Sequence, residues 1–273
     1  MKIKNMLNDQ PQEPIKDILN VQFIQPWSNM VCKIKLPDHI FKKLLAMYDY
    51  TMKDWKSFGG QLVGQIDEEP QVTPEILEKF PEWGQWCGQS VEQFVRCQMS
   101  QTMVGGEQDI QDFLKEEILT KITTMWFVNQ KANEYNPVHV HTNCKVSSVV
   151  YLKTPKNQIK GRKEHHQSDG KITFMNNGGT DPNFTNPQCS FKPEAGDMYV
   201  FPALQHHMVW PYRSTDPDDL RVSLSFNADF TTKTQLEEEQ KKQEKLYETM
   251  KKHKQSEVKD DKGVTDGNIN KSG

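Results

Sequence analysis

Residues 126–153 read WFVNQKANEYNPVHVHTNCKVSSVVYLK, and this stretch decides the fold. Runs rich in valine, tyrosine and other strand-forming residues stand on either side of a polar segment that holds Pro137 and several asparagines. Short runs of this kind, bounded by turn residues, predict antiparallel strands. Short runs of the same kind continue along the chain from about Lys121, so we expect a sandwich or jelly roll and not a parallel α/β sheet.

The predicted strands share short apolar or alternating patterns that end at Gly, Pro or Asn. They are Val31–Lys35, Thr123–Gln130, His139–Thr142, Ser147–Lys153, Lys171–Met175, Ser190–Lys192, Asp197–Phe201, His207–Trp210 and Arg221–Asn227. Glycine and asparagine supply the positive φ that the turns at Asn176–Gly179 and Ala195–Asp197 need. Lys156–Gly170 is a polar insertion, which we expect to form a loop over one end of the roll.

The part of the domain before these strands is predicted to be mainly helical. Asp38 begins a helix whose apolar residues recur at helical spacing. Thr73 is followed by proline, which favours a helix start because proline lacks the N–H that a first turn leaves free. Ser90 begins a capping-box pattern, and Ile110–Ile118 is a further amphipathic stretch.

Beyond Phe230 the chain becomes rich in Glu, Lys and Gln. Residues 235–254 predict a solvated helix, and the remainder is expected to be disordered. The chain is thus predicted to consist of an N-terminal extension (1–30), a mainly β domain with N-terminal helices (31–230) and a charged C-terminal tail (231–273).

Composition excludes several classes of protein. A net charge of −3 gives no electrostatic reason to expect non-specific nucleic-acid binding. The first ten residues lack the apolar core of a signal peptide, and no apolar run approaches membrane-spanning length, so no membrane partner is expected. The five cysteines are odd in number and show no CxxC spacing, which favours free thiols in a reducing, cytoplasmic setting.

Two histidines in the opening stretch suggest a metal site. His139 and His141 stand two residues apart, and on a strand this spacing places both imidazoles on the same face. Imidazole binds zinc, copper, nickel and iron, so the pair does not by itself identify the metal. His207, at the start of a later predicted strand, is the expected third ligand, with its neighbour His206 left to solvent.

The run RVSLSFN, residues 221–227, alternates polar and apolar side chains. Its polar face either lies in water or lines the inside of the roll, with the apolar face packed beneath the helices. In the second case Arg221 can form two charge-assisted hydrogen bonds with a carboxylate, and Ser223 adds a hydroxyl from the same face. An inward Arg221 needs an anionic partner, because burying an unpaired charge is costly.

Taken in order, these segments resemble the 2-oxoglutarate/Fe(II)-dependent oxygenases, in particular those common in phages and marine microbes. The matching stretches are Trp126–Lys153, Phe191–Pro211 and Arg221–Asn227, with a weaker feature, GQLVGQI, at Gly60–Ile66. The run FPALQHHMVWP followed by RVSLSFN is the most specific part. The similarity spans about residues 31–230 and excludes the tail.

The resemblance implies a double-stranded β-helix, the cupin-like form of the jelly roll. It implies that His139, His141 and His207 hold Fe(II), and that Arg221 binds the far carboxylate of 2-oxoglutarate with help from Ser223. The implied reaction uses O2 to convert 2-oxoglutarate into succinate and carbon dioxide, and couples this step to hydroxylation of a substrate C–H bond.

One feature departs from the wider superfamily, which carries His-x-Asp or His-x-Glu where this chain has His139 and His141. Either three neutral imidazoles hold the metal, or one of the pair lies outside the ligand set. Loss of the carboxylate removes a negative charge from the site and is expected to weaken iron retention. On an unbroken strand Tyr151 and His141 point to the same face, so the hydroxyl of Tyr151 either contacts the co-substrate or packs within the roll.

Two other functions fit parts of this pattern. A cupin-like three-histidine dioxygenase that does not use 2-oxoglutarate would explain the histidines but not Arg221 and Ser223. A non-catalytic β-roll, acting as a binding or virion-associated module, is compatible with the charged tail but leaves the three histidines unexplained. The sequence identifies no prime substrate.

Overall fold

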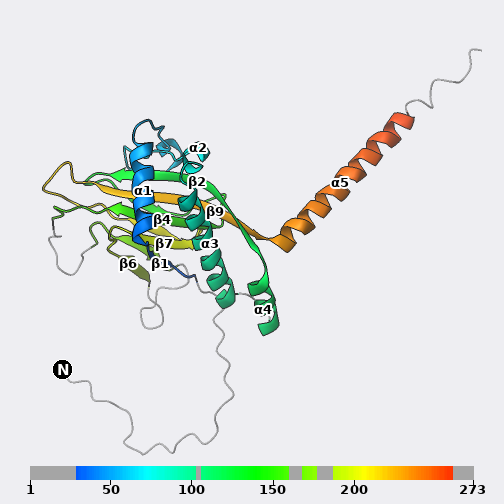
Figure 1. Ribbon diagram of the computed structural model, residues 1–273, viewed down its shortest axis with the longest axis horizontal. Helices are drawn as coiled ribbons and strands as arrows, with labels where there is room; N and C mark the ends of the chain where they lie inside the picture. The colour runs from blue at the N-terminus through cyan, green and yellow to red at the C-terminus, as the bar shows by residue number, and fades with distance from the viewer. Residues whose placement is uncertain (1–28, 103–105, 160–167, 177–186, 261–273) are drawn as a thin grey trace, which may run out of the picture.

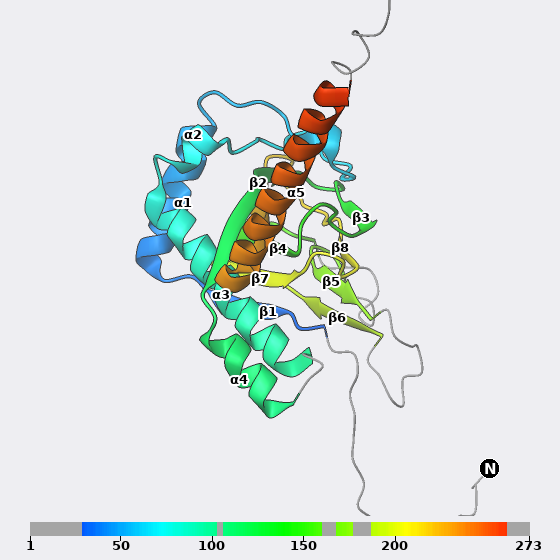
Figure 2. The same cartoon turned by 90° about the vertical axis from the view of Figure 1, so that its right-hand side faces the viewer.

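A computed structural model describes residues 29–102, 106–159, 168–176 and 187–260, and shows two antiparallel sheets with helices on one side (Figures 1 and 2). The larger sheet has the strand order β1-β7-β4-β9-β2 and the smaller β3-β8-β5-β6. The strands are β1 (Cys32–Lys35), β2 (Ile118–Gln130), β3 (Asn136–His139), β4 (Val146–Lys153), β5 (Ile172–Met175), β6 (Gln188–Phe191), β7 (Asp197–Pro202), β8 (His207–Val209) and β9 (Arg221–Thr232). The predicted fold class, a mainly β double-stranded β-helix with N-terminal helices, is confirmed.

The helices before the roll form its outer layer. They are α1 (Asp38–Thr51), the short 3₁₀ turn η1 (Gly59–Gln61), α2 (Pro74–Leu77), α3 (Pro81–Thr102) and α4 (Glu107–Lys115). Figure 2 shows α1 and α3 lying along the outer face of the five-stranded sheet. Leu44, Val91 and Phe94 from these helices pack against Leu224 and Phe226 of β9 in one buried cluster. The apolar face of the RVSLSFN run therefore packs beneath the helices.

A second, smaller core lies between the two sheets. Val149, Tyr151 and Tyr199 come from the large sheet, and they pack with Ile172 and Phe174 of the small sheet. This core fills one part of the roll. The remaining space between the sheets contains the cavity described below.

The structure corrects three of the predicted boundaries. The helix expected to start at Ser90 begins nine residues earlier at Pro81, and Ser90 is buried in its interior. Apolar side chains at helical spacing from Trp83 onward extend the buried stripe past the apparent cap, and burial overrides the local capping pattern. Ile118 belongs to β2, not to the preceding helix, and β3 ends at His139 and does not continue to Thr142.

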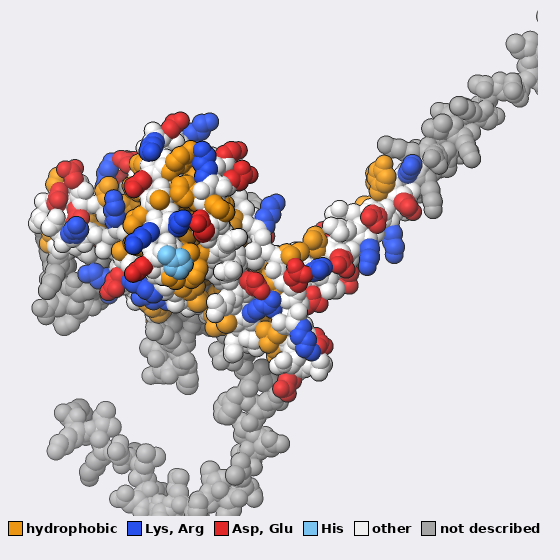
Figure 3. All heavy atoms as spheres, in the orientation of Figure 1, with side chains coloured by type: hydrophobic (Ala, Val, Ile, Leu, Met, Phe, Trp, Pro, Cys, Tyr) orange, Lys and Arg blue, Asp and Glu red, His pale blue; other side chains and the backbone are white. Residues whose placement is uncertain are grey.

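After β9 the chain continues directly into α5 (Lys233–Asp260), which extends away from the roll in Figure 1. Its visible surface alternates lysine and glutamate side chains (Figure 3). No helix of the described part of the chain is long and apolar enough to cross a membrane. Most of the predicted extension 1–30, much of the insertion Lys156–Gly170 and most of the turn at Asn176–Gly179 lie outside the described residues.

Candidate functional site

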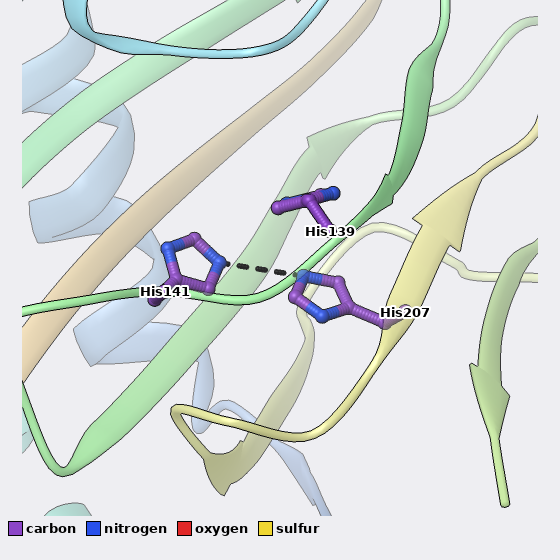
Figure 4. Close-up of side chains that lie close together, drawn as sticks. All are labelled: His139, His141 and His207. Atoms are coloured by element: carbon purple, nitrogen blue, oxygen red, sulfur yellow. Dashed lines mark hydrogen bonds between the residues drawn. The ribbon is translucent and has the colours of Figure 1, made fainter. Parts of the chain in front are cut away.

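Three histidines from separate parts of the sequence meet inside the roll (Figure 4). His139 ends β3 and His207 begins β8, and the two residues pair directly across these strands. His141 lies two residues beyond the end of β3, where its backbone N–H donates a hydrogen bond of 2.8 Å to the carbonyl of Ala203. Strand pairing fixes two of the imidazoles, and this backbone bond fixes the third.

The imidazoles are close enough to share one ion. One ligand atom from each of His139, His141 and His207 lies within 4.8 Å of the others. The Nε2 atoms of His141 and His207 are 3.3 Å apart, and the ring centroids of His139 and His207 are 4.2 Å apart. Within the described residues, no carboxylate belongs to this group.

Backbone carbonyls orient two of the rings. Nδ1 of His139 lies 2.7 Å from the Pro137 carbonyl oxygen, and Nδ1 of His207 lies 2.9 Å from that of Gln205. A carbonyl oxygen only accepts, so each Nδ1 carries the proton and each Nε2 keeps a free lone pair. This is the arrangement by which proteins hold histidine ligands for a metal.

Burial keeps the cluster uncharged. It lowers the pKa of His139, and burial together with the neighbouring His139 lowers the pKa of His141 to about 4. The pKa of His207 is also lowered, first by burial and then by His139 and His141. Neutral imidazoles are the form that binds a metal, and the Nε2 atom of His207 accepts a hydrogen bond from Nε2 of His141 at the place that an ion would take. The donor set therefore fits a divalent cation.

The histidines line a cavity of about 640 Å³ between the two sheets. Side chains of the large sheet form one wall in rows that cross the strands. One row contains Tyr151, Ser223 and Val128, which pair in that order across β4, β9 and β2. All three line the cavity, so the polar face of the RVSLSFN run faces inward.

Arg221 lies in the next row and is 1% exposed. Its guanidinium donates hydrogen bonds to the carbonyl of Gly170 (2.8 Å), to the side-chain oxygen of Gln130 and to the carbonyl of Trp210 (3.4 Å). None of these acceptors is charged, and a guanidinium has more N–H groups than these bonds use. Desolvation lowers the pKa of Arg221, so an anion nearby would stabilise it.

Tyr151 is the second polar group at this end. Its hydroxyl is buried, and the described residues provide it with no hydrogen-bond partner. Desolvation raises its pKa, while the charge of Arg221 acts in the opposite direction. A buried hydroxyl without a partner costs about 1–3 kcal/mol, which a ligand oxygen beside it would recover.

Among the cavity residues that were not predicted from the sequence, Gln130 and Glu69 bear most on the site. Gln130 lines the cavity and bonds Arg221, whereas Arg221 itself is not among the lining residues. Gln130 lies two residues after Val128 on β2, so the two side chains share a face, and alternation along the strand predicts that Gln130 faces the same way as Val128. Glu69, a buried acid in the segment before α2, also lines the cavity, and its surroundings in the sequence give no such signal. His206 is exposed, as expected.

Comparison with known proteins gives a family for the central part of the chain. Residues 124–227 match the family described as "Putative 2OG-Fe(II) oxygenase". The match includes the three histidines, Tyr151, Arg221 and Ser223. No curated protein sequence matches the chain.

Three solved structures are similar to this chain at low sequence identity. A Pseudomonas putida prolyl-4-hydroxylase is 17% identical, with 73% of this chain and 93% of that chain covered and a TM-score of 0.42. A 2OG-Fe(II) oxygenase family oxidoreductase from Burkholderia pseudomallei is 14% identical, with 72% and 84% covered and a TM-score of 0.40. A Trichoplax adhaerens prolyl hydroxylase, in complex with a hypoxia inducible factor peptide, is 11% identical, with 73% and 83% covered and a TM-score of 0.44.

The family match confirms the resemblance to 2-oxoglutarate/Fe(II) oxygenases. Since this family consists of enzymes, the prediction of an enzyme of this class is confirmed as well.

Proposed function

We propose that this chain, whose central residues match the 2OG-Fe(II) oxygenases, is a hydroxylase that consumes 2-oxoglutarate and O2. The observation that carries the proposal is the joint presence, in one roll, of a neutral three-histidine cluster and a buried arginine whose hydrogen-bond partners among the described residues are all neutral. The proposed overall reaction converts 2-oxoglutarate, O2 and a substrate C–H into succinate, carbon dioxide and C–OH.

In this proposal His139, His141 and His207 hold Fe(II) through their Nε2 atoms. The carbonyls of Pro137 and Gln205 keep the proton on Nδ1 of His139 and His207 and hold both rings in position. Bound iron supplies the site where O2 and 2-oxoglutarate react. Three neutral ligands leave the ion with its full charge, which favours binding of a dianionic co-substrate.

The far carboxylate of 2-oxoglutarate is proposed to lie at the Arg221 end of the cavity. Arg221 supplies the positive charge, and the buried hydroxyl of Tyr151 donates a hydrogen bond that it otherwise lacks. Ser223, the cross-strand neighbour of Tyr151, offers a second hydroxyl. Gln130 holds the guanidinium in place from the cavity wall.

The same end of the cavity argues against a three-histidine dioxygenase that does not use 2-oxoglutarate. Such an enzyme has no use for a buried cation next to an unpaired hydroxyl. A non-catalytic roll would gain stability by replacing these groups with apolar residues of similar size, since buried unpaired polar groups are destabilising.

Succinate formation tests the proposal. The full chain is purified anaerobically, loaded with Fe(II) and supplied with 2-oxoglutarate and O2. Arg221→Ala is run in parallel with Arg213→Ala, a change at a half-buried arginine that pairs with Asp169 and does not line the cavity. Slow succinate formation without a prime substrate is expected from the unaltered chain and from Arg213→Ala, and a loss of at least about tenfold from Arg221→Ala. Succinate formation that does not depend on Arg221 would reject the assignment of the co-substrate site.

A further inference from the structure

The cavity has one charged lining residue among those that the structure describes, and it is acidic. Glu69 is the only Asp, Glu, Lys or Arg that lines this space in the described part of the chain. Its side chain is 1% exposed, and its Oε2 atom is buried without a hydrogen-bond partner among the described residues. The proposed binding of iron and 2-oxoglutarate leaves this carboxyl unused.

The backbone fixes the direction in which Glu69 points. Residues 68–71 extend the large sheet beyond β2: Phe127 donates to the Pro70 carbonyl (2.8 Å) and Asn129 to the Glu68 carbonyl (2.9 Å). In this antiparallel register Glu69 lies opposite Val128, which faces the cavity. Glu68, one residue away, forms an ion pair of 3.0 Å with Lys131. Alternation therefore gives Glu68 a basic partner and leaves Glu69 facing the cavity.

Glycines border the carboxyl of Glu69, and the described residues give it no ion-pair partner. A Cβ atom on Gly59 would lie 3.0 Å from Oε2 of Glu69, and one on Gly64 would lie 3.2 Å from Oε1. Two glycines thus border the carboxyl closely. Burial and, to a smaller extent, the charge of Glu134 raise the pKa of Glu69.

Two aromatic residues from segments hydrogen-bonded to residues 69–71 line the same cavity. Phe58 donates its backbone N–H to the carbonyl of Glu69 at 2.8 Å, and the rings of Phe58 and Trp126 have centroids 5.3 Å apart. Both residues line the cavity. The Trp126 ring is also 6.0 Å from the ring of His141, so it links the Glu69 region to the histidine cluster. A carboxylate beside aromatic faces is the combination that binds ammonium groups.

We propose that Glu69, with Phe58 and Trp126, binds an aliphatic ammonium group of the prime substrate, such as that of a lysine side chain. This inference rests on the proposed function, which supplies the reaction, and adds the chemical class of the substrate. The ammonium pairs with Glu69 and lies against the rings, and its carbon chain passes Trp126 toward the histidines. The reacting C–H bond is then one near a positively charged nitrogen.

Calorimetric titration of the full chain tests this site. The probes are N-acetyl-lysine methylamide, its ε-trimethyl form and N-acetyl-norleucine methylamide, in which a methyl group replaces the aminomethyl end. The variants are Glu69→Gln, which removes the charge at constant size, and Glu68→Gln as the matched control one residue away. A thermal melt of each variant establishes that it is folded.

We expect the two cationic probes to bind at least about tenfold more tightly than the norleucine probe. Glu69→Gln should remove this preference and Glu68→Gln should retain it. Equal binding of the cationic and neutral probes, or an unchanged preference in Glu69→Gln, would overturn the proposal. Succinate formation without amine preference overturns the ammonium site alone, whereas amine preference without succinate formation supports the site and rejects the oxygenase.

Discussion

Replacing Glu69 by glutamine is expected to stabilise the fold, and to do so more at high pH than at low pH. Burial, and to a smaller extent the charge of Glu134, raises the pKa of Glu69 from 4.5 to about 7. The folded state therefore holds a proton more tightly than the unfolded chain does. Between about pH 4.5 and pH 7 the folded state binds more protons, so its stability falls as the pH rises.

The magnitude follows from the difference between the two pKa values. At 1.36 kcal/mol per pKa unit, a rise from 4.5 to about 7 corresponds to about 3 kcal/mol of destabilisation at pH 8. At pH 5 the same carboxyl costs less than about 1 kcal/mol, because it stays protonated in the folded state and pH 5 is only about half a unit above its pKa in the unfolded chain. Glu69→Gln should recover most of this cost.

Urea unfolding followed by circular dichroism, at pH 5 and pH 8 on metal-free protein, measures the effect. The free energy of unfolding of Glu69→Gln should exceed that of the unaltered chain by about 2–3 kcal/mol at pH 8, and by less than about 1 kcal/mol at pH 5. Glu68→Gln should show no such gain, because its pKa is lowered by the hydrogen bond to Lys131. An equal change at both pH values, or a destabilised Glu69→Gln at pH 8, would refute the claim that this carboxyl is buried without a partner.

Other substitutions test the rest of the cavity. His207→Ala should reduce the affinity for Fe(II) at least about tenfold, because the cluster would keep only two imidazoles. Anaerobic metal titration measures this, and an unchanged affinity would contradict the ligand assignment. Tyr151→Phe should raise the KM for 2-oxoglutarate about tenfold. It should not lower the free energy of unfolding, because the hydroxyl has no hydrogen-bond partner among the described residues. A destabilised protein with an unchanged KM would make the role of Tyr151 structural. Gly64→Ala should lower the free energy of unfolding by no more than about 1 kcal/mol in the same urea assay, because the atom that a Cβ would overlap is the side-chain oxygen of Asn136, which can rotate away. A much larger loss would mean that the Asn136 side chain is held in place.

The order of elements could be predicted well from local patterns. The short strand-forming runs, the alternation along β9 and the turn residues between strands predicted a jelly roll, and the inward face of β9 was one of two alternatives that periodicity left open. The structure decides between them because the helices α1 and α3 cover Leu224 and Phe226. Periodicity tells which residues share a face, but not which face is covered.

Errors arose where tertiary contacts outweighed local signals. Ser90 has a capping-box partner in the sequence, yet it lies inside α3 because Trp83 and Cys87 extend the buried stripe upstream. His141 was expected to follow His139 on one strand. It lies beyond the end of β3 and is positioned instead by its bond to the Ala203 carbonyl, from a loop more than sixty residues away.

The sequence by itself determined which residues are candidates for the chemistry: the His-x-His pair, His207 and the polar face that begins at Arg221. These follow from short-range spacing, which the chain encodes directly. Only the tertiary structure decided that Gln130 reaches Arg221 and that Glu69 enters the same cavity without a partner. Such pairings depend on which segments fold next to one another, and a buried acid looks the same in sequence as a solvated one.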